Sequence, residues 1–232
     1  MLVSVQISGK TLRRKDNDAM KPHIEEIRAF AERCFANSPG SHDWEHTVRV
    51  HNLSLHIGRV EGADLDVVGA AAFLHDIARP EQDASKGKIC HAAKGAAMAS
   101  ELLRKYPFPD GQRSNIIHCV RSHRFRESSK PETLEAKVLY DADKLDSIGA
   151  IGIGRAFLFA GEVGARLHIP DVRAEETEPY SEEDTGYREF KLKLSKIRDR
   201  MLTAEGRRIA EQRHTFMDAF FERFLEEYKG WM

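Results

Sequence analysis

Histidine and aspartate side chains gather in three short segments of this 232-residue sequence. The first segment, residues 42–50, contains His46, the second is the dipeptide His75-Asp76, and the third, residues 141–146, carries three aspartates. Imidazole nitrogens and carboxylate oxygens together suit a divalent ion such as Mn²⁺, Mg²⁺, Co²⁺, Ni²⁺, Fe²⁺ or Zn²⁺, and four such ligands leave positions open for water and substrate. These residues are therefore candidate ligands of a catalytic metal ion.

The first of these segments opens a predicted helix that runs to about Val60, with Ser41 or Asp43 as its cap. At 100° per residue, His46 and Arg49 fall on one narrow stripe of this helix, and the opposite side can supply core contacts. The stripe is interpreted as the lining of a polar cavity, and a solvated face is the alternative.

The helix predicted for residues 65–78 is apolar on nearly all sides until it reaches His75 and Asp76. Such a helix is buried, and a buried carboxylate beside a buried imidazole requires compensation by a cation or by hydrogen bonds. Either a metal ion or a simple His-Asp hydrogen bond can provide this compensation.

Near the end of another predicted helix, Asp143 is one of three acidic residues at a position where the helix dipole disfavours negative charge. Lys144 or a metal ion is therefore expected nearby.

The remaining periodicity is helical, so the predicted fold class is all-α, a single-domain bundle over residues 22–232 with its candidate ligands within 42–146 and the C-terminal helices packed on it. Residues 1–21 are expected to form a polar tail, and Met20 is a candidate start site. Loops are expected at 80–90, 106–111 and 161–186. Helices are predicted at 23–36, 43–60, 65–78, 92–105, 112–124, 131–146, 148–160 and 187–229, the last with a break near Thr203.

Composition narrows the functional classes. The 36 basic and 37 acidic side chains leave a formal net charge of -1, so no nucleic acid or anionic membrane is expected as a partner, and any affinity for phosphate must be local. The three cysteines, Cys34, Cys90 and Cys119, form no C-x-x-C pair, which argues against disulfides and fits a reducing cytoplasm. Neither a signal peptide nor a membrane-spanning segment is predicted.

Three segments carry a family resemblance by their sequences and their order: HDWEHTVRV at 42–50, FLHDIA at 73–78 and DADKLDSIGAIG at 141–152. Through them the sequence resembles the HD superfamily of metal-dependent phosphohydrolases. The resemblance runs from about residue 22 to the C-terminus. It implies an HD-type helical bundle around one divalent metal, and it selects Asp143 over Asp141 and Asp146. The implied ligands are His46, His75, Asp76 and Asp143.

The resemblance also implies hydrolysis of phosphate esters or anhydrides, often of nucleotides, and in the most similar branch cleavage of (deoxy)nucleoside triphosphates to monophosphate and pyrophosphate. Asp76 or Asp143 would orient the attacking water, and Arg49 is the first choice for contact with a phosphate. Lys144 would reach the phosphate or pair with Asp141 or Asp146. At Arg79, several relatives carry a glutamate, so their acid-base residue cannot simply be transferred.

Three further histidines, His91, His118 and His123, lie between the second and last implied ligands. In two-metal relatives such histidines complete a second ion, but His118 and His123 lie about 140° apart on a straight helix. Contact of His118 or His123 with substrate is therefore favoured over a second metal. His91 is expected to cap its helix or to line the entrance.

Other functions remain open. A 5'-nucleotidase or phosphodiesterase would use the same site, a non-catalytic nucleotide sensor would keep the metal without turnover, and a di-iron oxygenase would need two ions.

The aromatic residues between 216 and 224 are interpreted as core, with a homodimer contact as the alternative. The acidic 161–186 loop is a better lid or partner surface than a phosphate site.

Overall fold

The computed structural model describes the chain except for residues 1–10, 36–42, 86, 126–128, 171–172 and 232. In the described part the regular elements are all helices, which confirms the all-α prediction. The α-helices are α1 (Thr11–Cys34), α2 (Trp44–Glu61), α3 (Leu65–Leu74), α4 (Arg79–Ala84), α5 (His91–Leu103), α6 (Asp110–Ser122), α7 (Leu134–Leu145), α8 (Gly149–Glu162), α9 (Gly186–Leu192) and α10 (Ala204–Tyr228). Short 3-10 helices lie at Ala174–Glu176, Leu194–Lys196 and Arg198–Arg200.

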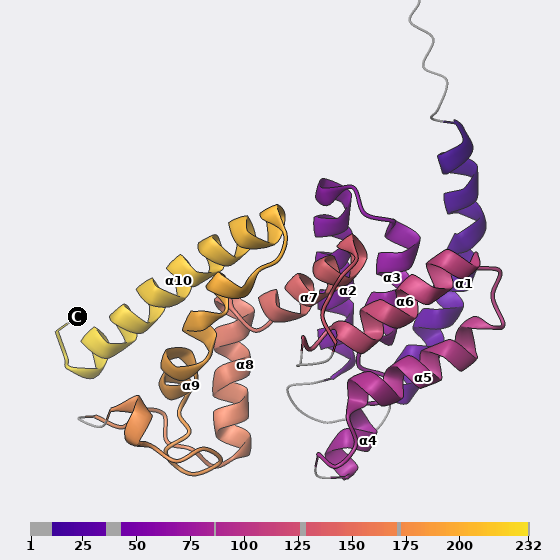
Figure 1. The fold of residues 1–232 in the computed structure, drawn as a ribbon. Coiled ribbons are helices and arrows are strands. Elements are labelled where there is room, and N and C mark those ends of the chain that lie inside the picture. Colours follow the sequence, from indigo (N-terminus) through magenta and orange to yellow (C-terminus); the bar gives the residue numbers. More distant parts are fainter. Residues whose placement is uncertain (1–10, 36–42, 86, 126–128, 171–172, 232) are drawn as a thin grey trace, which may run out of the picture.

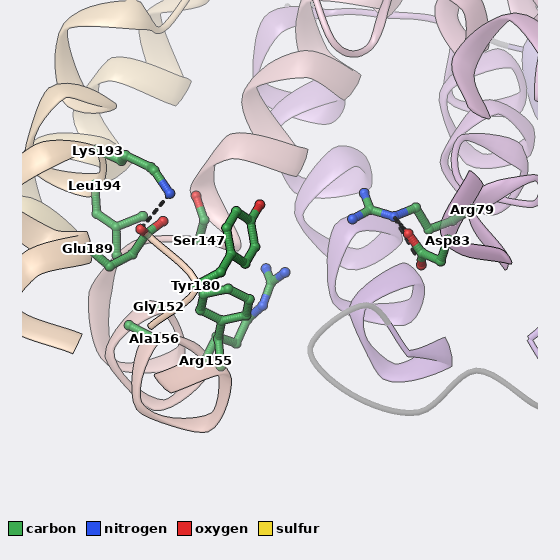
Figure 2. A pocket seen from close by; sticks show the side chains of 11 residues that line it. Arg79, Asp83, Ser147, Gly152, Arg155, Ala156, Tyr180, Glu189, Lys193 and Leu194 are labelled. Carbon is green, nitrogen blue, oxygen red and sulfur yellow. Dashed lines mark hydrogen bonds and ion pairs between the residues drawn. The ribbon is translucent and has the colours of Figure 1, made fainter. Parts of the chain in front are cut away.

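The helices form two groups (Figure 1). In the first group, α2 packs against α3 and α7, α3 against α1 and α6, and α5 against α6. The second group contains α8, α9 and α10, and α10 joins it to the first through contacts with α2 and α7. A cavity of about 460 Å³ lies where the groups meet, lined by α4 on one side and by α8 and α9 on the other (Figure 2).

Helix α3 is the centre of the first group. Every residue from Val67 to Leu74 is buried, as the apolar run predicts. Its start is fixed by Asp64, whose carboxylate accepts hydrogen bonds from the backbone N–H groups of Asp66 and Val67. The buried helix thus provides a rigid base for the two residues that follow it, His75 and Asp76.

The ends of α2 follow the predicted chemistry. Asp43 caps the helix, because its Oδ1 accepts a hydrogen bond from the His46 N–H at 2.9 Å. The alternative cap, Ser41, lies outside the described residues. Gly62 ends the helix in the left-handed conformation, with φ of 79°, where glycine has no steric penalty.

Several boundaries differ from the sequence prediction. Helix α1 begins at Thr11, well before residue 23, and contains Pro22, so the expected tail is partly helical. Helix α3 ends at Leu74 rather than residue 78, and the predicted 80–90 loop contains α4. Pro80, just beyond the predicted end of that helix, lies in the first turn of α4, where a proline has no helical hydrogen bond to lose. The break near Thr203 is confirmed, since Thr203 caps α10.

No helix in the described ranges combines the length and the apolar character that crossing a membrane requires.

Candidate metal centre

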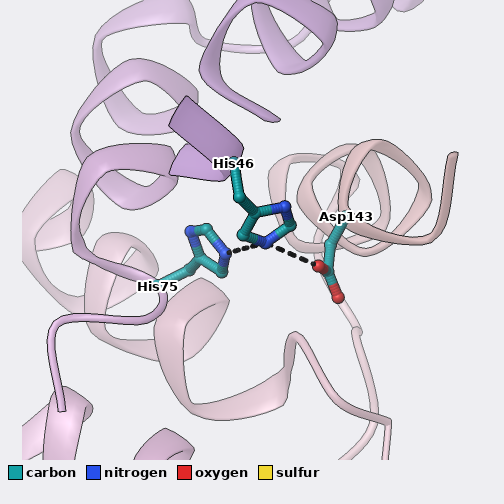
Figure 3. Close-up of side chains that lie close together, drawn as sticks. All are labelled: His46, His75 and Asp143. Carbon is teal, nitrogen blue, oxygen red and sulfur yellow. Dashed lines mark hydrogen bonds and ion pairs between the residues drawn. The ribbon is translucent and has the colours of Figure 1, made fainter. Parts of the chain in front are cut away.

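Two groups of ligand atoms meet at the centre of the first helix group. His46 from α2, His75 from the end of α3 and Asp143 from α7 form one group (Figure 3). Asp76, His91 and His123 form the other. Within each group the ligand atoms lie within 4.8 Å of one another, close enough to share one ion.

All four histidines of these groups are oriented in the same way. Each Nδ1 lies 2.7 to 2.8 Å from an oxygen that can only accept a hydrogen bond, so each Nδ1 carries the proton and donates it. Each Nε2 is then left to face the centre with its lone pair, the arrangement of a histidine ligand supported from behind. The acceptors are the Asp146 carboxylate for His46, the Ala72 carbonyl for His75, the Gln82 side-chain carbonyl for His91 and the Val120 carbonyl for His123.

The Nε2 atoms lie close together in pairs. The distance is 3.4 Å between His46 and His75 and 3.1 Å between His91 and His123. Two lone pairs at this separation repel each other unless a proton or a metal cation lies between or beside them. The donor set therefore fits metal ions, because a cation satisfies several nitrogens and carboxylate oxygens at once.

Asp76 connects the two groups. Its Oδ1 lies 3.0 Å from the His91 Nε2 and 3.4 Å from the His123 Nε2. Its Oδ2 lies 3.8 Å from the His75 Nε2 and 3.9 Å from the His46 Nε2. One carboxylate thus presents one oxygen to each group.

The aspartates of the centre are ionised despite burial. Burial alone would raise the pKa of Asp76, but His75, His123 and His91 together hold it well below its usual value. For Asp143, burial is likewise outweighed by the Lys144 ammonium and His46, which keep its pKa well below its usual value. Both carboxylates are therefore negative at neutral pH, as metal ligands must be.

Two of the histidines have opposite pKa shifts. Burial lowers the pKa of His75 to about 4, so this imidazole is neutral. Burial also lowers that of His46, but hydrogen bonds to Asp143 and Asp146 outweigh it and raise the pKa to about 9. In the metal-free protein His46 therefore carries a proton at neutral pH, and a metal ion must displace it.

Asp146, which was passed over as a ligand, supports His46 from behind. Its Oδ2 accepts the hydrogen bond of His46 Nδ1 at 2.7 Å, and its carboxylate also binds Arg49 and Arg155. Arg49 Nε lies 2.7 Å from Oδ1 and Arg155 Nη1 lies 2.8 Å from Oδ2. Arg49 thus shares the site's face of α2, as the stripe predicted, but its guanidinium is bound to Asp146, and its contact with phosphate stays a prediction.

The other two acids of this segment have different partners. Asp141 accepts hydrogen bonds from the Leu202 and Thr203 backbone and from the Thr203 hydroxyl, so it fixes the start of α10. Lys144 pairs with Asp143 at 2.8 Å, not with Asp141 or Asp146 as one alternative proposed. A neighbour on the same helix turn was the nearer partner.

A cavity of about 190 Å³ opens onto the ligands. Four cationic side chains line it together with Asp76, His91, His123, Asp143 and Ser147; they are Arg79, Arg124, Lys144 and Arg155. Arg124 and Arg155 were not predicted from sequence as phosphate-binding residues, although Arg124 directly follows His123. In the described part of the chain, neither Arg49 nor His118 belongs to this lining.

The three additional histidines have different surroundings in the structure. His118 accepts a hydrogen bond from the Glu132 backbone N–H at 3.1 Å, and no described contact links it to the site. His91 is buried in the second ligand group and lines the smaller cavity, and it is the first residue of α5 rather than its cap. Helix geometry predicts that His118 and His123 cannot share a second metal, but in the structure His123 lies against His91, which is on a different helix.

Comparisons with known proteins agree with this geometry. Residues 43–148 match the family model of the HD domain. The uncharacterized protein YpgQ of Bacillus subtilis is 33% identical over 213 residues, which cover 89% of this chain and 94% of YpgQ.

Two solved structures extend the likeness to the fold. An HD-superfamily hydrolase from Bacillus thuringiensis has a TM-score of 0.72 and 27% identity, with 90% of this chain and 98% of that one covered. Bacillus subtilis YpgQ in complex with ADP has a TM-score of 0.68 and 30% identity, with 89% and 95% covered. The chain therefore belongs to the HD superfamily, and it is a metal-dependent hydrolase.

Proposed function

We propose that this protein hydrolyses (deoxy)nucleoside triphosphates to the monophosphate and pyrophosphate. One observation carries the proposal: the two ligand groups open into a cavity whose lining includes four cationic side chains. Metal ligands and cations around one small space suit an anionic phosphate chain.

The ligands would be distributed over one or two divalent ions. His46, His75, Asp143 and one oxygen of Asp76 would hold the first ion, and His91, His123 and the other oxygen of Asp76 would hold a second. When bound, such ions polarise phosphoryl oxygens and lower the pKa of a water molecule. Which metal is used, and whether both positions fill, is decided by metal analysis of the purified protein.

The cations around the cavity have distinct expected roles. Lys144 is held by Asp143, so it stays beside the first ligand group and would contact the phosphate nearest the metal. Arg155 binds Asp146 through Nη1, while its buried Nε finds no partner among the described residues. A buried donor without an acceptor is costly, and a phosphate oxygen would satisfy it. Arg79 and Arg124 would bind the phosphate groups of the triphosphate that lie farther from the metal.

The nucleotide part of the proposal has separate support. The YpgQ structure contains ADP, which suggests that a relative with this fold binds nucleotides. A 5'-nucleotidase or a phosphodiesterase would use the same ligands, and a nucleotide sensor would bind without turnover. These functions differ from the proposal in their products.

The test is a screen of nucleoside mono-, di- and triphosphates and cyclic nucleotides against Mn²⁺, Mg²⁺, Co²⁺, Ni²⁺, Fe²⁺ and Zn²⁺, with separate assays for phosphate and pyrophosphate. Equimolar monophosphate and pyrophosphate are expected from triphosphates. Phosphate from monophosphates, or opening of cyclic nucleotides, would select one of the other hydrolases. Binding without any product would select the sensor.

Two substitutions test the site itself. Asp76→Ala and Asp143→Ala should each abolish activity and weaken metal binding, because each removes a carboxylate ligand. If either variant retains wild-type turnover, the assignment of the metal centre is wrong.

A further inference from the structure

The larger cavity, of about 460 Å³, lies next to the smaller cavity at the metal centre. The two cavities share Arg79, Ser147 and Arg155 as lining residues. Beyond them, the larger cavity is lined by α8 and α9 and by Tyr180 (Figure 2). Its volume lies in the range of about 300–1,000 Å³ typical of small-molecule sites, whereas the smaller cavity of about 190 Å³ suits a phosphate chain alone.

Tyr180 is an unusual residue at this cavity. Its side chain is 76% exposed although it is aromatic, and its backbone has a φ of 59°, in the left-handed region that tyrosine seldom adopts. Its ring meets that of Phe159 edge to face, with centroids 6.0 Å apart. In the view of Figure 2 it lies between Lys193 on one side of the cavity and Arg79 on the other.

A buried network holds Tyr180 in this conformation. Its backbone N–H donates to Asp184 Oδ2 at 2.8 Å, and Asp184 Oδ1 accepts from Arg188 Nη1 at 2.7 Å. Arg188 in turn donates to the hydroxyl and the carbonyl of Thr177. Both members of the Asp184–Arg188 pair are buried. A buried ion pair is weak evidence for stability alone, but here it fixes the turn that presents the ring.

We infer that the larger cavity is the nucleoside subsite and that the Tyr180 ring stacks on the base. The inference rests on the proposed function. The triphosphate would lie in the smaller cavity, and Arg155, which lines both, would mark the junction between phosphate and nucleoside. An exposed aromatic face in a fixed position offers contact area to a base with little loss of side-chain freedom.

The inference makes the effect of Tyr180 specific to ligands that have a base. Base stacking on an aromatic side chain contributes an affinity factor of about 5 to 150 when measured by alanine substitution. Nothing in the proposed contact involves the phosphates. Removal of the ring should therefore weaken nucleotide binding and leave inorganic tripolyphosphate unaffected.

The experiment compares wild type with Tyr180→Phe, Tyr180→Ala and Tyr180→Gly by calorimetric titration in the same divalent metal buffer. The ligands are an α,β-methylene nucleoside triphosphate, which resists cleavage, and inorganic tripolyphosphate. Glycine is included because it accepts the left-handed backbone, so that variant loses the ring without straining the turn. Phe216→Ala removes a ring that is 51% exposed on α10, where it lines neither of the two cavities, and serves as the matched control.

Tyr180→Gly and Tyr180→Ala are expected to weaken binding of the nucleotide analogue about 5- to 150-fold, with Tyr180→Phe and Phe216→Ala close to wild type. Unchanged analogue binding by Tyr180→Gly, or an equal loss for tripolyphosphate, overturns the stacking inference. Failure of the proposed function is seen separately: wild type would bind the analogue, with its dependence on Tyr180, yet release no pyrophosphate from nucleoside triphosphates.

Discussion

The hydrogen bond from His46 to Asp146 should control how tightly the first ligand group holds its ion, and Asp146→Asn tests this. The asparagine keeps the size of the side chain, and its carbonyl can still accept the His46 Nδ1 proton. The substitution removes the negative charge of the Asp146 carboxylate, whose oxygens lie 2.7 to 2.8 Å from nitrogens of His46, Arg49 and Arg155. The metal would then be held by a histidine of lower basicity.

The expected loss follows from the change in hydrogen-bond type. A hydrogen bond to a charged group contributes about 1.5–3 kcal/mol and a neutral one about 0.5–1.5 kcal/mol. The difference of about 1–2 kcal/mol weakens metal binding about 5- to 30-fold, at about 1.4 kcal/mol for each factor of ten. This range overlaps the roughly 10- to 100-fold loss of metal affinity that follows when the hydrogen-bond partner behind a metal-binding histidine is replaced.

The loss should depend on pH, because Asp146 also raises the pKa of His46. With a pKa of about 9, the His46 proton competes with the metal at pH 7 and much less at pH 9. Asp146→Asn lowers that pKa and so reduces the competition, which offsets part of the loss at pH 7. The fold-loss in affinity should therefore be larger at pH 9 than at pH 7.

The assay is anaerobic calorimetric titration of the metal-free proteins with Mn²⁺ at both pH values, together with thermal unfolding to verify the fold. Asp83→Asn is the matched control, because it makes the same chemical change in a carboxylate that pairs with Arg79 and is 60% exposed. Affinity of Asp146→Asn within twofold of wild type at pH 9, or an equal loss at both pH values, would refute this reasoning.

Three further results are expected. His123→Ala should reduce bound metal from two ions to one per chain by elemental analysis if the second group fills, and an unchanged count of two would contradict that role. The pKa of His46 is raised from 6.5 to about 9 on folding, so its contribution to metal-free stability is complete below about pH 6.5 and disappears as pH rises through 9; denaturant titrations of wild type and His46→Gln should converge over that window. Asp141→Ala should lower the free energy of unfolding by about 2–4 kcal/mol, since two backbone N–H groups and the Thr203 hydroxyl lose their acceptor, while the metal count stays unchanged.

Local chemistry predicted most of the fold. Asp43 and Gly62 determine where α2 begins and ends, Asp64 determines where α3 begins, and each of these signals acts within a few residues of its own position. The end of α3 was missed because the apolar run continues to Ala78, and periodicity alone cannot show where the backbone leaves the helix. The backbone turns there instead, with the Arg79 N–H donating to the Asp76 carbonyl.

The candidate site was predictable only as far as its residues follow the family pattern. The structure brings His46, His75 and Asp143 together, and places one oxygen of Asp76 near them. The second group depends on packing of α5 against α6, which brings His91 to His123 across 32 residues. A projection of one helix compares only residues on that helix, such as His118 and His123. It cannot detect a pair on two helices, such as His91 and His123.

The charge of the site illustrates a limit of composition. The whole chain carries a formal net charge of -1, which argues against a strong field around the molecule. Around the smaller cavity, by contrast, the lining carries four cations and two carboxylates, and two of the cations, Arg79 and Arg155, also pair with Asp83 and Asp146. The lining therefore presents more cationic than anionic side chains to a ligand, and bound divalent ions would add positive charge. Attraction of the proposed triphosphate substrate would therefore be a short-range property of this cavity, and we expect it to weaken with salt less than binding to an exposed basic surface does.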